Sequence, residues 1–87
     1  MERPFYKGQT FGQNEINNMK PAGAEFEQCV FRNCDLSNAD LSSAIFTKCE
    51  FHSCNLSNAK LSKTSVQDVK FKECKMLGLL FNNCSPF

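Results

Sequence analysis

Large apolar residues recur at every fifth position over residues 24–83. They are Phe26, Phe31, Leu36, Leu41, Phe46, Phe51, Leu56, Leu61, Val66, Phe71, Met76 and Phe81. A second, mostly small residue stands two positions before each of them, and this set is Ala24, Cys29, Cys34, Ala39, Ala44, Cys49, Cys54, Ala59, Thr64, Val69, Cys74 and Leu79. None of the fourteen charged residues of this region falls in either set. Both sets therefore mark positions that face a common interior.

A period of five is incompatible with a helix, because a step of five residues rotates by roughly 140° and spreads the apolar residues around the cylinder. Inward positions separated alternately by two and three residues instead indicate short extended segments joined by corners. Four such sides make a coil of twenty residues, and residues 29–42 match residues 49–62 at nine of fourteen positions. The pattern predicts an all-β fold, a parallel β-helix of about three full coils.

A twenty-residue coil also predicts which side chains stack in the interior. The predicted columns are Phe26, Phe46 and Val66; Phe31, Phe51 and Phe71; Leu36, Leu56 and Met76; and Leu41, Leu61 and Phe81. The second inward set is small because four corners crowd a narrow interior, which Ala and Cys fill without strain. A large residue there, as in Cys54→Phe, is expected to overpack the coil.

Both ends depart from the regular repeat. Residues 1–23 are expected to form an irregular lead-in and capping coil, in which Phe11 and Ile16 keep the inward phase and Pro21 breaks it. A short lead-in strand or a frayed tail is expected before residue 9, and a loop at residues 19–23. Residues 84–87 are expected to be a tail or a truncation point.

In the last repeat unit, Leu77 and Leu80 occupy outward positions that are polar elsewhere. Apolar residues in outward positions need cover. These two leucines are therefore candidate interface residues, and homodimerisation through an open C-terminal coil is one way to cover them.

Composition limits the class of protein. A chain of 87 residues, 9.8 kDa and net charge +1 forms one domain and lacks the strong charge of a simple nucleic-acid binder or anionic-membrane binder. No apolar segment is long enough to span a membrane, and the first residues lack the apolar region of a secretory signal, so a cytoplasmic location is expected. The three predicted coils carry net charges of −3, +2 and +1, so the sign changes along the rod.

The six cysteines follow the core register and are expected to be reduced, buried residues rather than disulfides. Metal binding is disfavoured because Ala takes the same position in other units, and because the single histidine, His52, faces outward. No catalytic or cofactor-binding residue is predicted. Cys84 is expected to be the thiol most reactive toward reagents.

The units Cys-Asp-Leu-Ser-Asn at 34–38, Ala-Asp-Leu-Ser-Ser at 39–43 and Ala-Lys-Leu-Ser-Lys at 59–63 resemble the pentapeptide-repeat family, whose pattern is A(D/N)LXX. The resemblance covers residues 24–83 and implies a right-handed quadrilateral β-helix. Within the family, the Cys- and Phe-rich units and residues 74–81 resemble the N-terminal part of Qnr-type bacterial proteins, which bind DNA gyrase and topoisomerase IV and confer fluoroquinolone resistance.

Gyrase protection in Qnr-type proteins is linked to an acidic surface that resembles duplex DNA. In this chain the acidic candidates for such a surface are Asp35, Asp40 and Glu50, but basic residues alternate with them: Asp40 is expected to stack toward Lys60 and Glu50 toward Lys70. The resemblance implies a non-enzymatic protein-binding scaffold whose partner is a type II topoisomerase, with no direct contact to nucleic acid or membrane. The alternatives are a structural or self-assembling module without a topoisomerase role and, less favoured, a redox or metal protein that uses the thiols.

Overall fold

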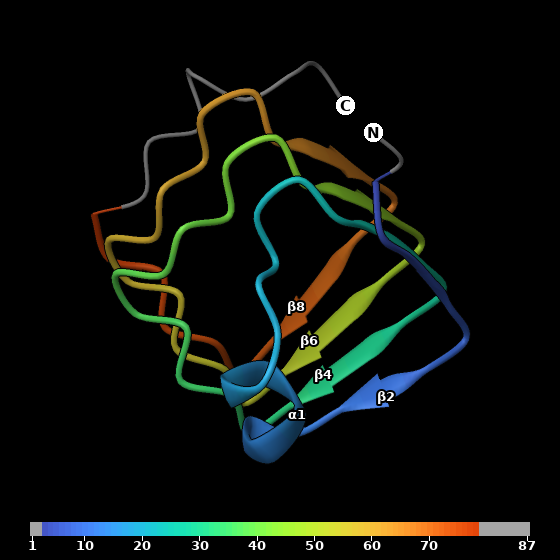
Figure 1. Cartoon of the computed structure of the whole chain (residues 1–87). Helices are drawn as coiled ribbons and strands as arrows, with labels where there is room; N and C mark the ends of the chain where they lie inside the picture. The colour runs from blue at the N-terminus through green and yellow to red at the C-terminus, as the bar shows by residue number, and fades with distance from the viewer. Residues whose placement is uncertain (1–2, 79–87) are drawn as a thin grey trace.

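The chain winds as a right-handed four-sided coil, and the computed structural model describes residues 3–78 of it (Figure 1). Two adjacent sides carry parallel sheets in the orders β1-β3-β5-β7 and β2-β4-β6-β8. The strands are β1 (Phe5–Lys7), β2 (Thr10–Phe11), β3 (Glu25–Glu27), β4 (Val30–Arg32), β5 (Ile45–Thr47), β6 (Glu50–His52), β7 (Ser65–Gln67) and β8 (Lys70–Lys72). The fold class predicted from the repeat is confirmed.

Successive coils pair at the predicted twenty-residue register. Phe26 pairs with Phe46 and Phe46 with Val66 in one sheet, while Phe51 pairs with Phe71 in the other. The two remaining sides contain no named strand among the described residues and are held by isolated parallel bridges. These bridges are Asp35 to Asn55, Asn55 to Lys75 and Asp40 to Lys60. The expected stacking of Asp40 on Lys60 and of Glu50 on Lys70 is therefore present.

Stacked aromatic rings form the core behind the two sheets. In one column the ring centroids of Phe31 and Phe51 lie 4.6 Å apart and those of Phe51 and Phe71 lie 5.2 Å apart, with the rings nearly parallel. In the neighbouring column Phe26 and Phe46 stack at 5.0 Å. Rings of the two columns meet edge to face, the arrangement that the aromatic quadrupole favours over a face-to-face sandwich. Both sheets are thereby fixed to a single core.

Each corner of the regular coils places one residue in the left-handed backbone region. Ten residues other than glycine have φ between 53° and 61°, at five-residue intervals from Gln28 to Glu73. All ten are polar or charged, and none is β-branched. Asn and Asp tolerate this conformation best, and a β-branched residue would be strained there. The polar positions of the repeat thus form the corners as well as the outer surface.

The N-terminal coil is more regular than the sequence predicts. The segment before residue 9 forms β1, which pairs with β3, and Tyr6 stacks on Phe26 with ring centroids 5.2 Å apart. The third side of this coil is a short helix, α1 (Gln13–Asn17), where an irregular segment was expected. Phe11 and Ile16 are buried as predicted. The expected loop at residues 19–23 is present.

Packing loosens in the third coil. Val66 continues the column of Phe26 and Phe46, but it is smaller than phenylalanine. An apolar cavity of about 20 Å³ lies beside it, and its lining includes Leu41 of the first coil, Phe46 of the second and Phe71 of the third. The cavity follows from this change of size within one core column.

Candidate interaction surface

The outward side chains of β4, β6 and β8 stack in two columns along the rod. Arg32, His52 and Lys72 form one column, and Val30, Glu50 and Lys70 form the other. This set of six residues is called the β4/β6/β8 side below. Because parallel strands lie about 4.8 Å apart, neighbouring members of a column are close enough for their charges to interact. The side carries three permanently basic residues and one acid.

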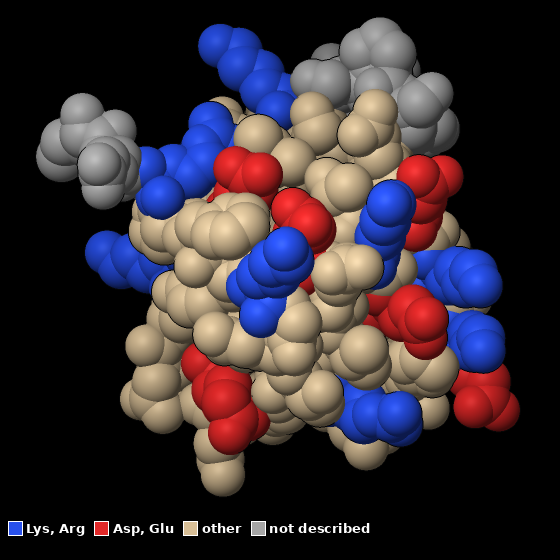
Figure 2. All heavy atoms as spheres, turned by 90° about the vertical axis from the view of Figure 1, so that its right-hand side faces the viewer, with Lys and Arg blue, Asp and Glu red and all other residues tan. Residues whose placement is uncertain are grey.

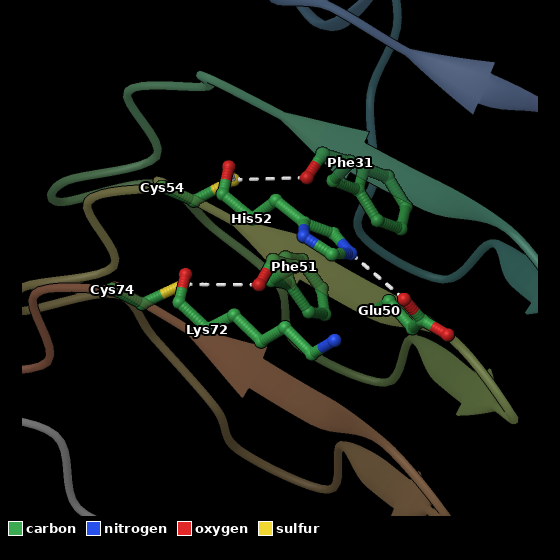
Figure 3. Close-up of polar contacts among 7 residues, drawn as sticks. All are labelled: Phe31, Glu50, Phe51, His52, Cys54, Lys72 and Cys74. Atoms are coloured by element: carbon green, nitrogen blue, oxygen red, sulfur yellow. Dashed lines mark hydrogen bonds and ion pairs between the residues drawn. The ribbon is translucent and has the colours of Figure 1, made fainter.

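Glu50 and His52 form a hydrogen-bonded pair on this side, with 2.7 Å between Glu50 Oε1 and His52 Nε2 (Figure 3). The bond from His52 and the nearby charges of Lys72 and Lys70 lower the pKa of the Glu50 carboxyl. The carboxylate therefore stays ionised and is already partnered by the imidazole. His52 lies outward, as its position in the repeat predicts.

The neighbouring sheet has the opposite bias. Its outward positions include Glu25 and Glu27, and Glu27 forms an ion pair with Lys7 at 3.7 Å. Figure 2 views the side of the molecule on which both sheets lie, and acidic and basic side chains intermingle there without an extended area of one sign. The two sheets therefore differ in the balance of their charges. Counting charge coil by coil along the sequence missed this difference between sides. The five-residue period could have predicted the difference in charge between the sides, because it assigns each charged residue to one side of the coil.

Asp35 and Asp40, two of the acidic interface candidates, lie on the two sides without named strands. The Asp35 carboxylate accepts hydrogen bonds from Ser37 Oγ at 2.6 Å and Ser37 N at 3.1 Å, and Asp40 accepts one from Ser42 N at 3.0 Å. Hydrogen bonding from the side chain and then the backbone N–H of Ser37 lowers the pKa of Asp35, and the same groups of Ser42 lower the pKa of Asp40. Glu50 lies on a different side, so the three acids do not form one acidic patch. Their role at an interface stays a prediction.

The buried thiols donate hydrogen bonds between coils. The Sγ atoms of Cys49 and Cys54 lie 3.3 Å from the carbonyl oxygens of Phe26 and Phe31, residues of the preceding coil. The hydroxyl of Thr64, at an equivalent inward position, donates to Leu41 O at 2.7 Å. Cys74, drawn with Cys54 in Figure 3, repeats the pattern to Phe51 O. The sequence indicated small buried residues here, but it gave no sign of this hydrogen-bonding role.

Burial makes Cys34, Cys49 and Cys54 poor nucleophiles. Desolvation raises the pKa of Cys34 to about 12 and that of Cys49 to about 11, and it also raises the pKa of Cys54. The five cysteines at positions 29 to 74 are free thiols. Within residues 3–78, no group of three or more His, Cys, Asp or Glu side chains is arranged to hold a metal ion. Cys84 lies outside the described residues.

Leu77, an interface candidate, is 75% exposed on the third coil, and Met76 beside it is 37% exposed. The outward position of Leu77 is as predicted, whereas Leu80 lies outside the described residues. A shallow hollow of about 350 Å³ adjoins Asp40 and the loop that contains Pro21. No helix among the described residues is long and apolar enough to cross a membrane.

Comparison with known proteins identifies the repeat. The family described as "Pentapeptide repeat region" matches residues 24–85. The full-length structure of QnrB1, described as a plasmid-mediated fluoroquinolone resistance protein, aligns with a TM-score of 0.56 and 22% identity over 92% of this chain and 48% of that chain. A trypsin-treated R167E form of QnrB1 aligns at 31% identity and a TM-score of 0.47, over 83% of this chain and 33% of that chain.

The chain thus spans about half the length of the full-length QnrB1 structure, and at this identity the likeness concerns the fold. No curated protein matches the sequence. The family match covers most of the chain and coincides with the repeat frame, the buried columns and the twenty-residue register. On these grounds the chain belongs to the pentapeptide-repeat family.

Proposed function

We propose that this protein is a non-enzymatic protein-binding scaffold. The observation that carries the proposal is a regular β-helix whose outward residues are held in register on flat sides. A stacked coil of this kind presents an extended, preformed surface to a partner, and binding costs little ordering of the backbone.

In its most concrete form, the proposal is that the chain binds a type II topoisomerase, DNA gyrase or topoisomerase IV, in the bacterial cytoplasm and contributes to fluoroquinolone resistance. The support is the resemblance of the Cys- and Phe-rich units to Qnr-type proteins, together with the fold shared with QnrB1, itself described as a fluoroquinolone resistance protein. Because the chain spans about half of that structure, the activity of a whole protein is part of the proposal.

A gyrase assay tests this form of the proposal. Purified chain is titrated into supercoiling reactions and into reactions that contain a quinolone, with circular dichroism to verify that the sample is folded. The proposal predicts less quinolone-stabilised cleavage as the chain is added. The variants Asp35→Asn and Asp40→Asn then test whether the acids contribute, with Lys20→Gln as a control on the loop beside Asp40. Unchanged cleavage at every soluble concentration of a folded sample would contradict the topoisomerase proposal.

A second candidate function, self-assembly through the third coil, is favoured by one observation. Leu77 is 75% exposed beside the partly exposed Met76, and burial of such apolar area favours association. Sedimentation velocity over a range of concentrations would show a dimer that the variant Leu77→Lys weakens. A monomer at all concentrations would remove this candidate.

A further inference from the structure

The β4/β6/β8 side carries three cations that form no close ion pair within residues 3–78. Arg32, Lys70 and Lys72 are all exposed. Within residues 3–78, the structure records ion pairs only for Lys7 with Glu27 and for His52 with Glu50, so none of these three cations has a carboxylate within ion-pairing distance. The one acid on this side, Glu50, already accepts its hydrogen bond from His52.

Arg32, Lys70 and Lys72 lie together on one side of the rod. Strand pairing aligns Arg32, His52 and Lys72 in one column, and Lys70 joins Lys72 on the same strand. Lys70 and Lys72 stand two residues apart on one strand, and an anionic group that approaches this side can interact with both. The fold does not require bases at these positions, because Val30 occupies an equivalent outward site and Ser65 and Gln67 do so on the neighbouring sheet.

We propose that the β4/β6/β8 side is a docking surface for an acidic segment of a partner protein. The partner's carboxylates would pair with Arg32, Lys70 and Lys72, and the Glu50–His52 pair between them would accept or donate hydrogen bonds. This inference rests on the proposed protein-binding function and specifies the side of the rod and the charge of its partner.

Charge complementarity favours a protein segment over nucleic acid as the occupant. Three cations would neutralise only a few phosphates, so the electrostatic gain for DNA or RNA is small. The ionised Glu50 in the middle of the side repels a continuous row of phosphates. An acidic polypeptide differs because its backbone N–H groups can donate hydrogen bonds to Glu50 and its side chains can contact the apolar Val30. The sign of the surface is also opposite to that of a surface that imitates DNA.

The test uses the full 87-residue chain and fluorescein-labelled octa-glutamate as the probe, with octa-lysine and a short DNA duplex as comparison probes. Fluorescence anisotropy at about 50 mM and about 300 mM NaCl measures binding and its dependence on screening. The proposal predicts that octa-glutamate binds, that the affinity falls at least about fivefold at the higher salt, and that octa-lysine does not bind.

Two double variants with the same change of net charge locate the surface. Lys70→Glu with Lys72→Glu removes two cations of this side and should weaken octa-glutamate binding by about tenfold or more. Lys20→Glu with Lys63→Glu alters exposed residues that lie outside the β4/β6/β8 side and should change the affinity less than about twofold. Thermal melts of both variants verify that they fold.

Three outcomes would overturn the inference. They are no binding of octa-glutamate at the lower salt, equal losses in the two double variants, and tighter binding of the DNA duplex with the same dependence on Lys70 and Lys72. The last result would assign the side to nucleic acid. Since the assay contains no topoisomerase, its failure is independent of the outcome of the gyrase assay.

Discussion

Replacement of Cys54 separates two roles of the inward thiols, filling space and donating a hydrogen bond between coils. Cys54 is 2% exposed, and its Sγ lies 3.3 Å from Phe31 O and 3.4 Å from His52 O. Three substitutions test these roles: Cys54→Ala removes the sulfur, Cys54→Ser keeps a donor, and Cys54→Phe adds bulk.

The expected magnitudes follow from these contacts. Alanine loses buried volume worth about 0.8 kcal/mol, roughly that of one methylene, and a weak hydrogen bond worth about 0.5 kcal/mol or slightly more. We therefore expect Cys54→Ala to lower the free energy of unfolding by about 1 to 2 kcal/mol. Serine is expected to cost less than alanine, because the hydroxyl of Thr64 already makes the equivalent bond at 2.7 Å. Phenylalanine should cost about 1 to 3 kcal/mol or more, because four corners leave no room for a ring.

Urea and thermal unfolding under reducing conditions, followed by circular dichroism, measure these differences. A change of 1 kcal/mol shifts the thermal midpoint of a domain of this size by about 4 to 8 °C, which is easily resolved. If serine proves less stable than alanine, Cys54 acts only as a small apolar residue and the hydrogen-bonding role is wrong. If phenylalanine leaves the midpoint unchanged, the inward assignment of Cys54 is wrong.

Three further predictions concern the corners, the third coil and the thiols. Ser53 has a φ of 54°, in the left-handed backbone region. Ser53→Gly should therefore be neutral or stabilising, and Ser53→Val should lower the free energy of unfolding in urea by about 1 to 2 kcal/mol. Equal stability of the two variants would contradict a requirement for the left-handed conformation at this corner. Val66→Phe should raise the thermal midpoint by extending the phenylalanine column into the cavity beside it, and a lower midpoint would mean that the third coil cannot accommodate a ring. The raised pKa values of Cys34 and Cys49, about 12 and about 11, mean that the folded chain keeps protons that the unfolded chain loses above pH 9. Stability should therefore fall between about pH 9 and pH 12, and the double variant Cys34→Ser with Cys49→Ser should flatten this fall in urea titrations at several pH values.

The regular part of the fold follows from the sequence because its determinants repeat. Every unit places one large and one small residue at fixed spacing, and each coil must bury these residues against the next. The position of Phe51 in the repeat therefore predicts both the side of the rod on which it lies and its stacking on Phe31 and Phe71. The register is specified strongly, because a slip of one residue would turn the phenylalanines outward.

The N-terminal coil was harder to predict because its determinants are not repeated. Tyr6 has the same phase as Phe11 and Phe26, which was a usable signal for β1. Helix α1 has five residues, too few for a hydrophobic period to be recognised. Its start is marked mainly by the bond from Gly12 N to the Glu15 carboxylate, at 2.8 Å.

The candidate surface was only partly predictable for a different reason. The repeat constrains the interior and leaves the outward positions free, so Asp35, Asp40 and Glu50 were grouped by charge rather than by side. The structure places Asp35 and Asp40 in local turns and Glu50 beside His52 among basic residues. Charges become informative only after each residue is assigned to a side of the rod.

Direct binding of the purified chain to purified DNA gyrase tests the central claim most directly. With the chain immobilised and gyrase titrated in biolayer interferometry, the account predicts saturable binding by the wild type and by Lys20→Glu with Lys63→Glu. A sample shown to be folded by circular dichroism that gives no saturable binding to gyrase or to topoisomerase IV would contradict the claim that this rod is a topoisomerase-binding scaffold.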